Sequence, residues 1–160
     1  MDSTTAILTA KLLATALALT AAGYSFNSSQ NAVPLLYREP IRTSTSIFAR
    51  TFFAGATFAV PTSLGSVLAS SYLAYALPSQ RSLWATSAGL VLATMPLTRL
   101  VMWPGIMRLI AISRDEKLEE EVEGTGEHIG LLKAWVRQNY LRASLYFAGG
   151  MVGLWAVVTA

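Results

Sequence analysis

Four long stretches of the chain carry almost no charged residues, and each is long enough to cross a lipid bilayer. A membrane-spanning helix needs about 20 mostly apolar residues. Uninterrupted charge-free runs cover residues 12–37, 51–80, 82–98 and 143–160. The last two continue past isolated basic residues, toward residue 107 and back to residue 129. We therefore predict four membrane spans, at residues 6–33, 47–77, 82–110 and 129–158.

The composition and the turn signals agree with an all-α, integral membrane four-helix bundle. Charged residues make up 13% of the chain, about half of their share in soluble domains. Pro34, Pro40, Pro78 and a pair of glycines near residue 125 separate the apolar runs. No alternating pattern is long enough for a membrane β-barrel. The length predicts one domain over residues 1–160 and is too short for a doubly wound nucleotide-binding enzyme.

The charges are strongly segregated along the chain. Segment 114–127 holds seven of the nine acidic residues and two basic ones, so its net charge is −5. This composition predicts a solvated, charged loop between the third and fourth spans. The basic residues of the remaining chain are scattered between apolar runs rather than clustered, which argues against nucleic acid as a partner.

Lysine and arginine also predict the orientation of the bundle. They concentrate in the connections after the first and third spans, and such loops usually face the cytosol. We expect both termini on the opposite side of an intracellular membrane, with lipid as a partner. The first apolar run is expected to be a retained span rather than a cleaved signal peptide, because Asp2 and a late Lys11 replace the usual basic start.

The fourth predicted span places polar and aromatic residues on one helical face. Trp135, Asn139, Arg142 and Tyr146 are spaced i, i+4, i+7 and i+11, and His128 precedes them on the same stripe. The arginine lies about 13 Å along the helix axis from the nearest interfacial lysine. Polar groups at such depth are costly and usually face a bundle interior, so these residues are candidates for a functional site.

The third and first predicted spans bring further polar groups to a similar depth. Arg99 is followed by Trp103 four residues later. Pro96 and Pro104 flank this pair, and we expect them to bend the helix and free carbonyl groups. In the first span, polar residues gather on or beside one face: Tyr24, Asn27, Gln30 and Asn31.

Each of these features has a structural alternative. The amide side chains of the first span also fit a helix that unwinds at the membrane interface before Pro34. The two tryptophans also fit an interfacial aromatic belt. The two arginines also fit a structural role, bound to carbonyls that the prolines free. For the glycines at 149, 150 and 153 we expect close helix packing.

Conventional catalytic and cofactor-binding motifs are missing from the sequence. There is no cysteine, His128 is the only histidine, no carboxylate lies inside a predicted span, and no glycine-rich phosphate loop occurs. We therefore predict no metal site and no bound flavin or nicotinamide cofactor.

The residues of the fourth span resemble a known family. The run 131–143, LLKAWVRQNYLRA, resembles the LL-x-x-W-x-x-x-N-x-x-R signature of the fungal anthrone oxygenase family. Members of that family are small four-span membrane proteins of polyketide pathways. Further stretches resemble it in the expected order, at residues 23–30 with Pro34, at 55–61, and at 96–102 with 104–106.

The resemblance implies that the chain oxidises an anthrone, a tricyclic aromatic ketone, to an anthraquinone with molecular oxygen and without a cofactor. The implied catalytic residues are Arg142, Asn139, Arg99 and His128. The implied substrate-binding residues are Trp135, Trp103, Tyr24, Asn27, Gln30, Asn31 and Tyr146. His128 is one candidate for the base, and Tyr24 or a water held by Asn139 are the others.

Two alternatives to catalysis stay open at this point. The charge-rich stretch 108–137 also fits a non-catalytic scaffold or accessory subunit that gathers pathway enzymes. A small-solute transporter is the third alternative, because a homo-oligomer of four-span chains could form a path. The expected partners are thus a small aromatic polyketide, membrane lipid and, in the oligomeric case, further copies of the chain.

Overall fold

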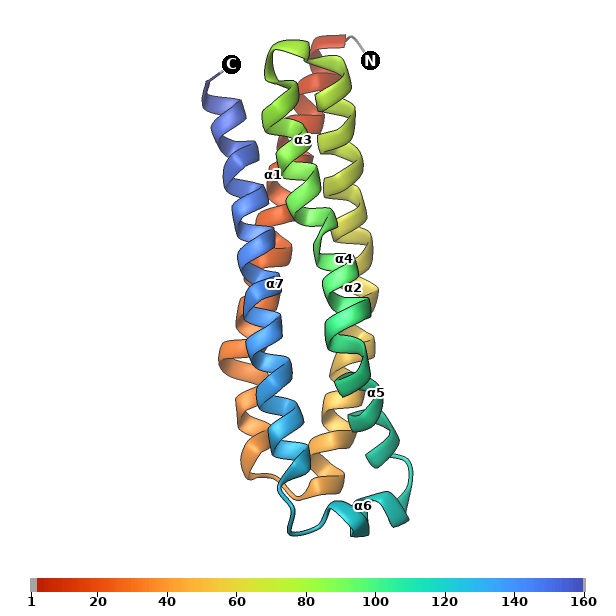
Figure 1. Ribbon diagram of the computed structural model, residues 1–160. Coiled ribbons are helices and arrows are strands. Elements are labelled where there is room, and N and C mark those ends of the chain that lie inside the picture. The colour runs from red at the N-terminus through yellow and green to blue at the C-terminus, as the bar shows by residue number, and fades with distance from the viewer. Residues whose placement is uncertain (1–2, 160) are drawn as a thin grey trace.

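The computed structural model describes residues 3–159 and is built from helices (Figure 1). No β-strand occurs within this range. Met1, Asp2 and Ala160 lie outside it, including the aspartate used above to predict a retained first span. Four helical rods are long and apolar enough to cross a membrane: Thr4–Arg38, Ile41–Ala76, Pro78–Ile112 and Glu127–Val158. The predicted all-α, four-span fold is confirmed, and the chain is a multi-pass membrane protein.

Two of the four rods are continuous α-helices and two are interrupted. The continuous ones are α2 (Ile41–Ala76) and α7 (Glu127–Val158). The first rod consists of α1 (Ser3–Asn27), a π-helical turn η1 (Ser28–Ala32) and a 3-10 segment η2 (Val33–Arg38). The third rod follows a short 3-10 turn η3 (Pro78–Gln80) and consists of α3 (Arg81–Leu92), α4 (Thr94–Pro96), the π-helical η4 (Leu97–Met102) and α5 (Trp103–Ile112).

The rods are longer than the predicted spans. The α2 helix begins at Ile41, directly after Pro40, whereas the apolar pattern predicted a start at residue 47. Its 36 residues extend over about 54 Å at 1.5 Å per residue, well beyond a hydrocarbon core of about 30 Å. Hydropathy detects only the part of a helix that needs an apolar solvent, so the polar ends were missed.

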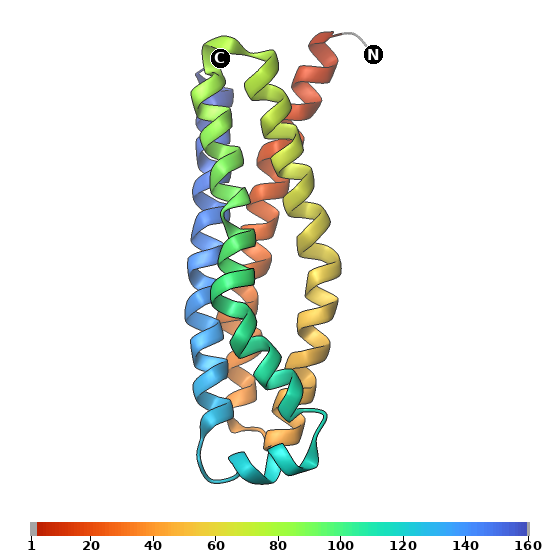
Figure 2. The same ribbon diagram turned by 45° about the vertical axis from the view of Figure 1, so that its right-hand side comes forward.

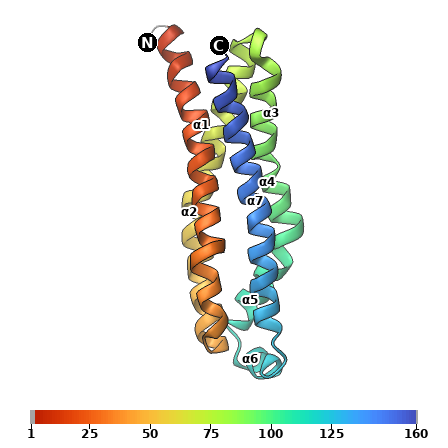
Figure 3. The same cartoon turned by 90° about the vertical axis from the view of Figure 1, so that its left-hand side faces the viewer.

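The bundle runs up and down, with both chain ends on one side (Figures 1 and 3). We call this side the terminal end. The opposite side, the loop end, carries η2 and a short helix, α6 (Glu116–Val122), within the predicted charged loop. Around the bundle, α1 packs against α7 and α2, and α3 packs against α2 and α7.

Small residues and buried hydroxyl groups hold the terminal half together. A Cβ atom on Gly150 would lie 2.7 Å from Cδ2 of Leu19, so a larger residue here would force the Leu19 side chain to move where α7 meets α1. The predicted close packing of these glycines agrees with this geometry. Buried polar side chains then join neighbouring rods: Ser66 Oγ donates to Ala14 O at 2.8 Å, Ser87 Oγ to Gly149 O at 2.8 Å, and Gln80 Nε2 to Ala156 O at 2.7 Å.

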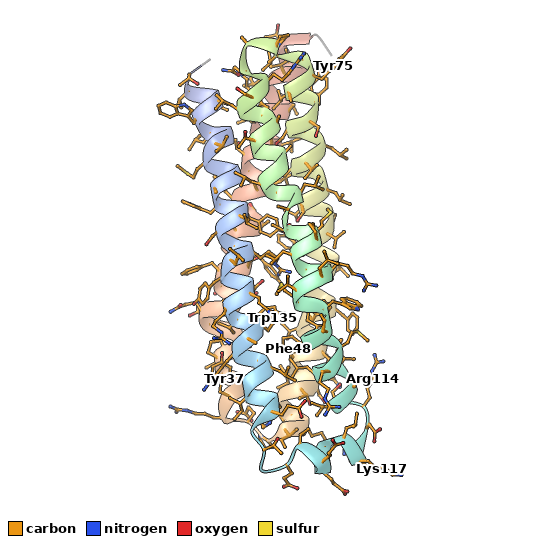
Figure 4. All side chains as sticks on the ribbon, viewed as in Figure 1. Tyr37, Phe48, Tyr75, Arg114, Lys117 and Trp135 are labelled. Carbon is orange, nitrogen blue, oxygen red and sulfur yellow. The ribbon has the colours of Figure 1, made fainter. Side chains whose placement is uncertain are left out.

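The loop half has a bulkier apolar core and an ionic cap. Phe48 of α2 meets the ring of Trp135 edge to face, with centroids 5.4 Å apart (Figure 4). Arg108 of α5 binds Glu127 at the start of α7 at 2.8 Å, which joins the two rods on either side of α6. Between this core and the terminal half, the rods separate enough to leave a cavity.

Candidate functional site

An apolar cavity of about 380 Å³ lies inside the bundle, between α1, α2, the third rod and α7. Its walls are largely aromatic. Phe52 and Phe53 contribute from α2, Trp103 from α5 and Trp135 from α7. A cavity of this size and composition fits a small planar apolar molecule, because ligand pockets of about 300–1,000 Å³ with few polar groups bury most of a drug-sized ligand.

One wall of the cavity carries a cation and three hydroxyl groups. Arg142 is half-buried and lines the cavity together with Tyr24, Tyr146 and Ser63. The Tyr146 hydroxyl shares a hydrogen bond of 2.7 Å with Ser63 Oγ. No carboxylate of residues 3–159 forms an ion pair with this arginine. The positive charge is therefore available to an anion in the cavity.

Two buried donors on this wall have no hydrogen-bond partner within the described chain. They are Nε of Arg142 and the indole nitrogen Nε1 of Trp135. An unpaired buried donor costs about 1–3 kcal/mol, so two of them beside one cavity need a physical explanation. Both atoms are shielded from the cavity in this structure, so a ligand acceptor would reach them only after a small movement of the side chains.

Local backbone geometry places Tyr24 against this wall. A Cβ atom on Gly55 of α2 would lie 2.6 Å from the Tyr24 hydroxyl, so the glycine makes room for the phenol. The tyrosine ring also packs against Phe58, with centroids 5.0 Å apart. The phenol is therefore held between α2 and the cavity, with its hydroxyl directed away from α1.

A second arginine lies at the rim of the same cavity. Arg99 belongs to η4, lines the cavity and is exposed on the outer surface. Its guanidinium carbon lies 4.7 Å from the centroid of the Trp103 ring, in a cation–π arrangement. The ring in turn lies 6.5 Å from that of Phe52, so an aromatic series links the rim to the interior.

π-helical turns flank the cavity on two rods. In η1, the N–H of Val33 bonds to the carbonyl of Ser28, and in η4 the N–H of Trp103 bonds to the carbonyl of Thr98. Pro96 and Pro104 lack an N–H, so the α-helical ladder is already incomplete around η4. Such turns occur frequently at functional sites.

Asn139 lies outside the cavity, although it shares the sequence stripe of Arg142. It is fully buried, and its amide nitrogen donates to Ser25 O and to Ser29 Oγ, both at 2.8 Å. Ser29 Oγ donates in turn to Val136 O at 3.5 Å. These bonds tie α7 to the first rod beside η1. The geometry therefore points to a positioning residue rather than a group that touches a ligand.

The other four predicted site residues also lie apart from the cavity. His128 is buried in the first turn of α7, about 21 Å along the axis from Arg142. Asn27, Gln30 and Asn31 are exposed on the outer face of the first rod. There, Asn31 donates to Asn27 at 2.8 Å, and the Tyr140 hydroxyl donates to Gln30. Contrary to the structural alternative, the first rod does not unwind before Pro34; it widens in the π-helical η1 and stays helical through η2 to Arg38.

The structure thus brings together six of the predicted site residues: Arg142, Arg99, Trp135, Trp103, Tyr24 and Tyr146. The contribution of α2 to the cavity was not predicted from the sequence. Phe48, Phe52, Ala59 and Ser63 share one face of that helix and line the cavity. A helical face that carries aromatic residues and then small ones was the available signal.

Among residues 3–159, no group of histidine, cysteine or acidic side chains is arranged to hold a metal ion.

Comparison with known proteins gives one match. The model of a family described as anthrone oxygenase matches residues 48–152, which include α7 through Val152 and most of the cavity wall. No curated protein and no solved structure matches the chain.

Proposed function

Because this chain belongs to the anthrone oxygenase family, we propose that it oxidises a polyketide anthrone to the corresponding anthraquinone with molecular oxygen, inside the membrane and without flavin or metal. The observation that carries this proposal is the aromatic cavity with the Arg142 guanidinium on its wall and no carboxylate beside it within residues 3–159. A planar three-ring ketone has the shape and polarity that such a cavity accepts.

In the first chemical step, the methylene carbon opposite the ketone loses a proton. The product is an anthrolate, in which the negative charge resides mainly on the former ketone oxygen. Arg142 stabilises this oxygen anion in a site of low dielectric, where a fixed cation acts far more strongly than in water. The Trp135 indole N–H, which lacks a partner in the described chain, is a second donor for an oxygen of the ligand.

Tyr24 is the group that we assign to proton transfer. Tyr24 lines the cavity together with Arg142, so its phenol oxygen lies beside the bound ligand. The alternative base, His128, would have to act from the first turn of α7, about 21 Å away along the helix. Tyr24 in its ionised form accepts the methylene proton and later returns it.

Oxygen then accepts electrons directly from the anthrolate. One-electron transfer gives an anthrone radical and superoxide, and their recombination forms a carbon–oxygen bond at the former methylene carbon. The Tyr24 hydroxyl protonates the peroxide. Loss of the remaining hydrogen on that carbon, with cleavage of the O–O bond, releases water and leaves the quinone. One O₂ is consumed for each anthrone. One of its oxygen atoms enters the quinone and the other leaves in water.

Replacement of Arg142 tests this proposal. Arg142→Gln removes the charge and should lower turnover by about 10²–10³, as for other donors to a developing oxyanion. Because an uncharged residue relieves the cost of a cation at this depth, the variant should insert and fold normally. Arg142→Lys keeps the charge without the planar fork and should retain partial activity.

The matched control is Arg137→Gln on the same helix, because Arg137 is exposed and lines no part of the cavity. Oxygen uptake and quinone absorbance would be followed in membranes that contain only this protein. Normal turnover by Arg142→Gln would exclude the proposed role of the arginine. A wild-type protein that binds anthrone without forming quinone would favour the scaffold alternative.

We also propose that the loop end faces the cytosol, because the basic connections gather there. Insertion of a glycosylation sequon between Arg38 and Arg42 should leave the chain unmodified. A glycan at that site would reverse the orientation.

A further inference from the structure

The cavity is open on one side of the bundle. Phe53 and Val60 of α2 line the cavity, and they are also 48% and 52% exposed on the outer surface. Arg99 of η4 combines the same two properties. Figure 2 shows the ribbons of α2 and the third rod separating between their ends. Because exposed residues of both α2 and η4 line the cavity, it opens between these two elements, with the three residues at its rim.

This opening lies at the depth of the acyl chains. Val60 is close to the middle of α2, about 29 Å along the axis from Ile41 in a helix of about 54 Å. Arg99 lies only about 6 Å from the midpoint of the rod Pro78–Ile112. With the hydrocarbon core of about 30 Å centred on the midpoints of these rods, both positions fall inside it. The cavity thus opens toward lipid rather than toward water.

The rim carries a cation that the described chain does not neutralise. The only partner of the Arg99 guanidinium within residues 3–159 is the Trp103 ring, and no carboxylate pairs with it. A cation at hydrocarbon depth is costly and marks a functional position. Together with Arg142, it gives one apolar cavity two guanidinium groups, one inside and one at the opening.

We propose that the ligand reaches the cavity from the lipid through the opening between α2 and η4, and that Arg99 at its rim selects ligands with an ionised acidic group. The tricyclic character of the ligand rests on the function proposed above. A planar polyketide dissolves readily in acyl chains, whereas its carboxylate or phenolate needs a counter-ion there. Arg99 supplies this counter-ion next to an aromatic ring on which the planar ligand stacks.

Reversible closure of the opening tests the route of access. The chain has no cysteine, so Val60→Cys gives a single thiol at the rim. The folded variant, in liposomes of zwitterionic lipid, would be labelled with a bulky aromatic methanethiosulfonate, which a reductant later removes. Binding of 9,10-anthraquinone-2-carboxylate would be followed through quenching of tryptophan fluorescence. The matched control is Leu68→Cys, because Leu68 is 69% exposed on α2 but lines no part of the cavity.

The label on the Val60→Cys variant should slow association at least about tenfold, and reductant should restore the original rate. The label on the Leu68→Cys variant should leave the rate unchanged. Equal rates for labelled and unlabelled Val60→Cys would overturn lateral access. Because the label is added after folding and is removable, a misfolded variant cannot produce the expected result.

The charge of Arg99 is tested with two matched ligands. Arg99→Gln should weaken binding of the carboxylate about tenfold and leave neutral 2-methyl-9,10-anthraquinone unchanged, whereas Arg99→Lys should retain most of the preference. Equal effects on both ligands, or no effect on either, would overturn the assignment. If addition of phosphatidylglycerol to the vesicles abolishes the preference of the wild-type protein, Arg99 binds lipid phosphate instead and the assignment fails.

These measurements concern binding alone and need no turnover. A protein that shows gated, charge-selective binding but forms no quinone would contradict the proposed oxidation and leave the route of access intact. If the protein forms quinone at the same rate with the label on the Val60→Cys variant, the proposed route of access is contradicted and the proposed oxidation is supported.

Discussion

Replacement of Asn139 by alanine separates a residue that builds the site from one that acts in it. Its amide nitrogen donates two hydrogen bonds of 2.8 Å, to Ser25 O and to Ser29 Oγ, from a fully buried position. Alanine removes both bonds and leaves the two acceptors without this donor. The α7 helix then loses its polar link to the first rod beside η1.

The expected magnitude follows from the number and setting of these bonds. Hydrogen bonds between membrane helices contribute about 0.6 kcal/mol on average and up to about 1.7 kcal/mol. Loss of two such bonds should therefore lower the free energy of unfolding by about 1–3 kcal/mol. For a chain of this size, the midpoint of thermal unfolding in detergent should fall by about 3–10 °C. Turnover should fall less than in Arg142→Gln, because Asn139 touches no part of the cavity.

Asn31→Ala is the control for this measurement. Asn31 is exposed, and its side chain bonds only to exposed Asn27, so the same substitution should change stability by less than about 0.5 kcal/mol. Circular dichroism melting and oxygen uptake would be recorded on the same preparations. If Asn139→Ala keeps the wild-type melting point and still loses turnover about 10²-fold, the asparagine acts in catalysis and the positioning role is wrong.

Further outcomes are expected from the packing and from the donor set. Gly150→Ala should destabilise the protein by about 1–3 kcal/mol in thermal melts, because its Cβ would lie 2.7 Å from the Leu19 side chain. Gly130→Ala, with open space around it, should be neutral or stabilising. Gly55→Ala should push the Tyr24 hydroxyl aside and lower turnover by up to about 10²-fold with little change in melting temperature, since its Cβ would lie 2.6 Å from that oxygen. Exhaustive chelation should leave turnover unchanged, and stoichiometric iron or copper in active preparations would contradict the proposed chemistry.

The four spans and one side of the cavity could be predicted because they depend on local properties of the sequence. Hydrophobic length determines which helices cross the membrane, and helical periodicity places Trp135, Arg142 and Tyr146 on one face. The same periodicity could not separate Asn139 from them. A stripe about 100° wide touches two neighbouring rods, and only the packed bundle shows that the asparagine faces the first rod while the arginine faces the cavity.

Other parts of the site depend on tertiary structure that the sequence does not encode locally. Asn27, Gln30 and Asn31 were predicted to bind substrate, but η1 widens the first rod at that point and these side chains lie on the outer surface. Ser63 carries no motif, and its role emerges only from the hydrogen bond of 2.7 Å to Tyr146 on a distant rod.

The π-helical turn η4 also bears on how such a chain can change over generations. A hydrogen bond between residues i and i+5 encloses one residue more than the i to i+4 bond of an α-helix, so η4 is equivalent to a single inserted residue. Deletion of Leu100, which is 75% exposed, would let the rod close into a regular α-helix while the segments above and below keep their partners. One codon therefore separates a rod with a rim arginine at the opening from a straight span. Related chains that lack one residue at this point in the middle of the membrane would keep the four-helix bundle but would differ in the ligands that can enter the cavity.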